Sequence, residues 1–164
     1  MEDFMTSGTA VVTLPKDTEI LITREFAAPK HLVYKAWTTP ELVKRWWAGS
    51  KGKVTLAEID LRVGGKWRYV MVMEKGGEVG FHGEYKEIVA NDRIVMTEVY
   101  EGAPGDGPAP LNIVTFAETD GRTTLTLLAQ CGSKTLRDII INSGMESGMQ
   151  KAWDRLEQVA ISLR

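Results

Sequence analysis

The sequence SGMESGMQKAWDRLEQVAISLR, residues 143–164, decides the fold. Its apolar residues recur every three or four positions, which is the spacing of one stripe along an amphipathic helix. The stripe comprises Met145, Met149, Ala152, Trp153, Leu156, Val159, Ala160 and Leu163. Ser143 is followed three residues later by Glu146, a capping-box pattern, so we predict that the helix begins at Ser143.

Two glycines interrupt this predicted helix. Gly144 and Gly148 lie one helical turn apart. Glycine costs roughly 1 kcal/mol in a helix relative to alanine, so their presence indicates that another part of the chain approaches the helix backbone closely. We expect that part to be a β-sheet. The methionines and Trp153 on the stripe are interpreted as core residues and, nearer the surface, as an adaptable wall of a ligand pocket, because thioethers are flexible.

The chain before this helix is dominated by strand patterns with a period of two. We expect strands at 19–26, 54–61, 66–73, 80–89, 93–100, 111–118 and 122–130. Two short helices are expected after the first strand, with Pro29 and Pro40 at their first positions and Thr39 as a cap. Another short helix, capped by Ser133, is expected before the terminal helix. The order of strand, two helices, six strands and long helix predicts an α+β fold, in which a curved antiparallel sheet of about seven strands wraps around the C-terminal helix.

Composition limits the number of domains and the classes of partner. A chain of 164 residues is expected to form a single domain over residues 1–164, with 1–9 as a flexible lead-in. The 20 basic and 22 acidic residues nearly cancel, which argues against a nucleic-acid partner. No apolar run approaches the roughly 18 residues that span a bilayer. The single Cys131 and the lack of a signal-peptide pattern favour a cytoplasmic protein.

Five segments of the chain together resemble a known family. They are ITREFAAPKHLVYKAWTTPELVKRWW at 22–47, IDLRVGGKWRYVM at 59–71, FHGEYKEIV at 81–89, RIVMTEV at 93–99 and SGMESGMQKAWDRL at 143–156. In this order they resemble the START-like helix-grip superfamily (SRPBCC), and within it the bacterial family related to the activator of the heat-shock-protein-90 ATPase. The resemblance implies a helix-grip fold with a cavity between sheet and helix that takes a hydrophobic or amphipathic small molecule. Relatives with this fold include lipid carriers, cyclases and co-chaperones, so the fold alone does not select the function.

The candidate ligand-binding residues come from this expected cavity. They are Trp46, Trp67, Tyr69, Met71, His82, Glu84, Met96, Phe116, Met145, Met149 and Trp153. A four-residue turn at 74–77 would set Tyr69 opposite His82 and Trp67 opposite Glu84, bringing both polar residues into the cavity. A register shifted by one residue would instead turn Phe81 inward and send His82 and Glu84 to solvent.

Three functions remain open from the sequence. We favour binding of a small molecule without a cofactor or metal, because the two histidines, His31 and His82, do not form a cluster of metal ligands. A cyclase- or hydrolase-type enzyme would use His82 with Glu84 or Tyr69 for acid–base chemistry. An interaction module, either co-chaperone-like or a homodimer, would have a filled interior.

Overall fold

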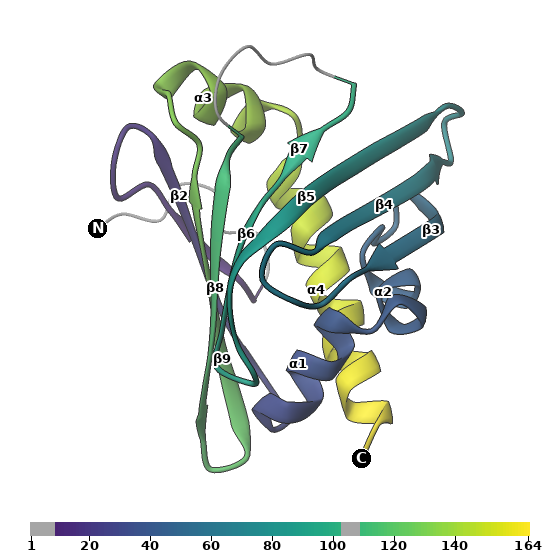
Figure 1. Ribbon diagram of the computed structural model, residues 1–164, viewed down its shortest axis with the longest axis vertical. Helices are drawn as coiled ribbons and strands as arrows, with labels where there is room; N and C mark the ends of the chain where they lie inside the picture. Colours follow the sequence, from purple (N-terminus) through teal and green to yellow (C-terminus); the bar gives the residue numbers. More distant parts are fainter. Residues whose placement is uncertain (1–8, 103–108) are drawn as a thin grey trace.

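The computed structural model describes residues 9–102 and 109–164, which form a curved antiparallel sheet around a long helix (Figure 1). The strands are β1 (Val11–Thr13), β2 (Glu19–Phe26), β3 (Gly52–Ile59), β4 (Lys66–Met73), β5 (Glu78–Val89), β6 (Arg93–Thr97), β7 (Val99–Tyr100), β8 (Leu111–Thr119) and β9 (Arg122–Gln130). The helices are α1 (Lys30–Thr38), α2 (Pro40–Trp46), α3 (Lys134–Asn142) and α4 (Met145–Ser162). The predicted α+β fold is confirmed. Most of the predicted lead-in, residues 1–8, lies outside the described residues.

The sheet has the strand order β1-β2-β9-β8-β6-β5-β4-β3, and β7 pairs with β5. The strand pairs among the described residues are all antiparallel, as the sequence predicted. The predicted strand at 93–100 is divided at Glu98, because β6 pairs with both β5 and β8 whereas β7 continues along β5 alone. This division and the short β1 raise the strand count in the described residues from the predicted seven to nine.

The helix α4 lies on the concave face of the sheet and carries the predicted apolar stripe (Figure 1). Leu156 and Ala160 are completely buried, and α1 and α2 pack against the same helix. The helix α3 lies at the opposite end of the sheet from α1, next to the start of α4 (Figure 1). None of the helices in the described part of the chain combines the length and apolar character needed to cross a membrane.

The start of α4 differs from the prediction. The helix begins at Met145, and the residue before it, Gly144, has a left-handed backbone with φ of 85°. Ser143 donates its hydroxyl hydrogen bond back to the carbonyl of Ile140, so the capping box with Glu146 does not form. Because α3 ends at Asn142, two residues must reverse the chain, and glycine adopts the required positive φ at little cost. The predicted Ser133 cap of α3 is confirmed, since its hydroxyl accepts a hydrogen bond from the Leu136 amide at 3.0 Å.

The close approach predicted at Gly148 is present, but the approaching segment is not a strand of the sheet. It is the connection between α2 and β3. A Cβ atom at Gly148 would lie 2.9 Å from Cε of Lys51, and a Cβ atom at Gly49 would lie 3.1 Å from the amide nitrogen of Ala152. Lys51 also donates a hydrogen bond from Nζ to the carbonyl of Gly144 at 3.2 Å. The glycines of α4 therefore seat this connection against the helix.

Candidate functional site

The aromatic face of β4 points towards α4, as predicted. Trp67 and Tyr69 are 2% and 7% exposed. Trp67 lies opposite Gly83 on β5, and its indole Nε1 donates a hydrogen bond to the carbonyl of Thr97 at 3.1 Å. A Cβ atom at Gly83 would lie only 2.5 Å from this indole nitrogen. Glycine at position 83 therefore makes room for the indole of Trp67.

The predicted register between β4 and β5 is wrong by one residue. Tyr69 pairs with Phe81, and Arg68 pairs with His82. The turn is one residue shorter than the four-residue turn expected from the sequence. The Met73 amide donates a hydrogen bond to the carbonyl of Gly77 at 2.9 Å, which leaves three residues, 74–76, between them, and Gly76 and Gly77 both have positive φ. A shift of one residue transfers every side chain to the other face, so His82 lies on the outer face of the sheet.

Glu84 lies on this outer face as well, and His82 and Glu84 therefore do not line the space beside α4. Glu84 forms ion pairs with Lys66 at 2.7 Å and Lys86 at 2.8 Å, which lower the pKa of its carboxyl to about 2. Tyr69 is on the opposite face of the sheet from both residues. The acid–base arrangement of His82 with Glu84 or Tyr69 is thus not formed.

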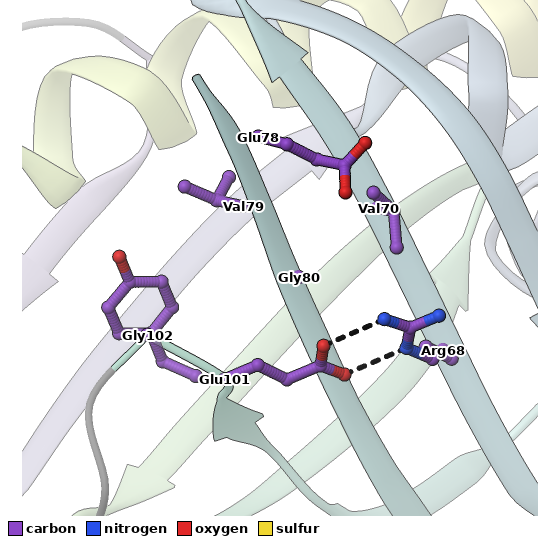
Figure 2. A pocket seen from close by; sticks show the side chains of 8 residues that line it. Arg68, Val70, Glu78, Val79, Gly80, Glu101 and Gly102 are labelled. Carbon is purple, nitrogen blue, oxygen red and sulfur yellow. Dashed lines mark hydrogen bonds and ion pairs between the residues drawn. The ribbon is translucent and has the colours of Figure 1, made fainter.

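His82 instead belongs to a charged cluster with Glu101 and Arg68 on the outer face. Figure 2 shows the Arg68–Glu101 pair of this cluster. Glu101 accepts two hydrogen bonds of 2.9 Å from Arg68, and one of its oxygens lies 2.9 Å from Nδ1 of His82. Gly80 leaves space for the Glu101 carboxylate, because a Cβ atom there would lie 2.4 Å from Oε1. These contacts lower the pKa of Glu101 to about 2. The cluster borders a surface hollow of about 190 Å³ and attaches the segment after β7 to β4 and β5.

Three of the predicted wall residues lie deep in the core near α1. Trp46, Phe116 and Trp153 are each less than 5% exposed. Trp37 joins them, since its ring centroid lies 5.0 Å from that of Trp46, 6.3 Å from Phe116 and 6.2 Å from Trp153. Trp46 Nε1 also donates a hydrogen bond to the carbonyl of Ala36 at 2.9 Å. This end of the concave face is filled by closely packed aromatic rings.

Met71 occupies a separate small cluster with Ala48 and Val54. Trp47, the neighbour of the buried Trp46, is only partly buried. Its ring centroid is 5.3 Å from that of Tyr69 and 4.9 Å from that of Phe81. Trp47 therefore packs edge-on against Tyr69 and Phe81.

The concave face is less completely covered towards α3. Leu125 is completely buried, but Leu127 and Ala129, which follow it on the same face of the central strand β9, are partly exposed. Met145 and Met149 of α4 are also partly exposed and pack against the same core. Leu127 and Ala129 on the sheet and Met145 and Met149 at the start of α4 therefore present partly accessible apolar surface.

Polar groups adjoin this accessible apolar surface. Asn112 is 6% exposed and shares the inward face of β8 with Val114 and Phe116. Its Nδ2 donates a hydrogen bond to Oε1 of Glu98 at 3.1 Å, which places the Glu98 carboxyl on the inward side. Burial raises the pKa of Glu98, and the hydrogen bond from Asn112 offsets part of this increase. The pKa of Tyr69 is well above its usual range because of burial, with smaller contributions from Tyr85 and Glu98.

We refer to these surroundings as the α3-end site. It consists of Tyr69, Met96, Glu98, Asn112, Leu127 and Ala129 on the sheet and Met145 and Met149 on α4. Within the described ranges, no three His, Cys, Asp or Glu side chains are grouped as metal ligands. The site therefore offers hydrogen-bonding groups within an apolar wall, which is the usual composition of a site for a small organic molecule.

Comparison with known proteins agrees with the fold and the sequence pattern. The family model described as Activator of Hsp90 ATPase homolog 1-like protein matches residues 27–160. The chain belongs to this family. Membership of the Hsp90-activator-homologue family, part of the SRPBCC superfamily, confirms the resemblance noted in the sequence. Among curated proteins, none is similar enough to the chain to count as a match.

Several proteins of known structure share the fold of this chain. A protein from Rhodobacter sphaeroides has a TM-score of 0.83 at 22% identity, covering 93% of this chain and 98% of its own. A protein from Arthrobacter aurescens has a TM-score of 0.82 at 24% identity, covering 92% and 91%. An HSP90 activator from Plasmodium falciparum has a TM-score of 0.54 at 26% identity, covering 70% and 73%. The first two comparisons establish likeness of fold.

Asn112, Leu127 and Ala129 of the α3-end site were not among the residues predicted from the sequence. A signal for Asn112 was present, because it alternates with Val114 and Phe116 and is thus a polar residue on a core face. Leu127 and Ala129 carry no such signal, since their partial exposure depends on how far α4 covers the sheet. Glu98 is placed on the inward side by its hydrogen bond with Asn112, which depends on the pairing of distant segments.

Proposed function

We propose that the protein binds a hydrophobic or amphipathic small molecule at the α3-end site. The observation that carries this proposal is the partial exposure of Leu127 and Ala129 on the inward face of a central strand, beside the completely buried Leu125. A monomeric domain normally covers such a face completely. The hydrogen-bonding groups of Tyr69 and Glu98 beside this apolar surface would orient a ligand.

Met96, Met145 and Met149 give the site the means to adjust to a ligand. An unbranched thioether side chain has three rotatable bonds and repacks at low cost. Burial of about 300 Å² of apolar ligand surface at about 25 cal/mol per Å² would contribute about 7 kcal/mol, before the entropic cost of association. Ligand binding would therefore be accompanied by movement of these methionines rather than by rearrangement of the aromatic core around Trp37.

A second candidate is binding of a protein partner, a chaperone or a second copy of the chain. The family description and the likeness to an HSP90 activator at 26% identity favour it. A partner protein would contact an outer surface and would leave the α3-end site unchanged. The two candidate functions therefore differ in which side chains change their surroundings on binding: those of the α3-end site for a small molecule, and those of an outer surface for a protein partner. The single Cys131, which is buried, fits a cytoplasmic setting for either function.

Native mass spectrometry of freshly purified protein tests the first proposal. We expect an additional mass that is lost on denaturation. Ala129→Phe would fill the α3-end site and remove this mass, whereas Ala117→Phe, at an exposed position on β8, would retain it. Circular dichroism would verify that both variants are folded. An additional mass retained in Ala129→Phe, or bare dimers of the wild type, would contradict the proposal.

A further inference from the structure

The carboxyl group of Glu98 is distinguished from the surface carboxylates by its partners. Glu84 has two lysines and Glu101 has Arg68 as ionic partners. Within residues 9–102 and 109–164, no Lys or Arg nitrogen lies within ion-pair distance of Glu98, whose described side-chain partner is the neutral amide of Asn112. The residues outside these ranges, 1–8 and 103–108, include no Lys, Arg or His. Among the residues that the structure describes, Glu98 is thus an inward-facing carboxyl group without a Lys or Arg partner.

The position of Glu98 is fixed by the backbone as well as by Asn112. Its amide donates a hydrogen bond to the carbonyl of Pro110 at 3.0 Å. Asn112 pairs with Met96 on β6, so the amide and the carboxyl group approach from adjacent strands. The hydrogen bond from Asn112 is made to Oε1 and leaves Oε2 of Glu98 without a hydrogen bond to another described residue. An acceptor in an apolar wall is stabilised by a hydrogen-bond donor supplied from outside the chain.

Tyr69 completes the polar part of the site. Its side chain is 7% exposed, and its ring packs against those of Trp47 and Trp67. The charge of Glu98 contributes to the raised pKa of Tyr69, so the two groups interact electrostatically. Tyr69 therefore stays protonated at neutral pH and can donate to, or accept from, a polar ligand group.

From these groups we infer that the ligand of the α3-end site carries a hydrogen-bond donor at its polar end, a hydroxyl or a protonated amine, and that the site excludes carboxylates. This inference rests on the proposed function and specifies its ligand class. A donor would satisfy the free oxygen of Glu98, and a positive charge would also compensate its buried negative charge. A carboxylate head would lie beside a like charge in a weakly solvated site, which is unfavourable.

A matched series of ten-carbon compounds tests the inference. Decan-1-ol, decylamine and decanoate have the same chain and differ at the polar end. Their dissociation constants would be measured at neutral pH by calorimetry for the wild type, Glu98→Gln and Glu84→Gln. The last variant removes a carboxylate from the outer face and serves as the control for net charge.

We expect the wild type and Glu84→Gln to bind decylamine and decan-1-ol at least about tenfold more tightly than decanoate, which is the effect of a like-charge contact in a partly buried site. Glu98→Gln, which keeps the shape of the side chain, should reduce the preference for decylamine over decanoate at least about fivefold. Equal binding of decanoate and decan-1-ol by the wild type, or an unchanged preference in Glu98→Gln, would overturn the inference while leaving ligand binding intact. Failure of all three compounds to bind would overturn the proposed function and the inference with it.

Discussion

The indole of Trp67 donates a hydrogen bond to the backbone carbonyl of Thr97, 3.1 Å away, across the position where Gly83 has no side chain. This contact joins β4 to the end of β6 over the intervening strand β5. It holds the position of Trp67 beside Tyr69, and it holds the backbone of Thr97, the residue before Glu98. The geometry of the α3-end site thus depends on Gly83, which has no chemical role in the site and only leaves room for this contact.

Gly83→Ala is expected to destabilise the protein by at least about 3 kcal/mol, because an added Cβ atom overpacks a fixed contact. It would lie 1.8 Å from the Thr97 carbonyl oxygen and 2.5 Å from the Trp67 nitrogen. Gly76→Ala is the control, since it meets no atom within 4 Å and suffers only the cost of its positive φ, about 1 to 2 kcal/mol. Urea unfolding would measure both, and equal losses would contradict the packing described for Trp67.

Glu101 is expected to make stability depend on pH. Its pKa in the folded protein is about 2, below the value of about 4.3 for an unfolded chain, so its contribution is present above about pH 4.3 and is lost as the pH falls towards 2. Glu101→Gln should lower the urea midpoint at about pH 5 and leave it equal to that of the wild type at about pH 2. A difference that is the same at both pH values would show that Glu101 acts through packing rather than charge.

The two serines near α3 should differ in their effect on stability. Ser133→Ala removes the hydroxyl that caps α3 and should cost about 1 kcal/mol. Ser143→Ala should cost less than about 0.5 kcal/mol, because Ser143 is exposed and does not cap α4. Thermal unfolding would compare the two variants. A larger loss of stability in Ser143→Ala than in Ser133→Ala would contradict this account and support the capping box that the sequence predicted.

Gly49 and Gly148 should also respond differently to alanine. Gly49→Ala should cost more than about 2 kcal/mol, since Gly49 has φ of 58° and its Cβ atom would press on the fixed backbone of α4. Gly148→Ala should stay within about 1 kcal/mol of the wild type, because Cε of Lys51 can move and alanine favours the helix. Denaturant unfolding would rank the variants, and the reverse order would show that Lys51 is held rigidly.

The sequence predicted the elements of this fold well, because their signals are local. The alternation of Trp67, Tyr69 and Met71 is uninterrupted, and β4 was predicted to the residue, 66–73. The stripe on α4 likewise extends over five turns without a break. These patterns depend on neighbouring residues alone.

The contacts of the site could not be predicted to the same extent, because they depend on how elements meet. The register of β4 with β5 was set by the positive φ values of Gly76 and Gly77, and it moved His82 to the outer face. The pairing of Glu98 with Asn112 depends on the alignment of β6 with β8. The close approach to Gly148 is made by Lys51, which is almost a hundred residues away in the sequence. No local sequence pattern around either residue indicates this contact.

The central claim, that a small molecule binds at the α3-end site, is tested most directly by the methyl NMR signals of the methionines. Protein labelled with ¹³C at the methionine methyl groups would be titrated with decan-1-ol, and signals would be assigned by Met→Leu variants. We predict that the signals of Met96, Met145 and Met149 shift saturably while those of Met71 and Met73, in the separate cluster, stay in place. Shifts confined to Met71 and Met73, or no shift in any signal, would contradict the claim.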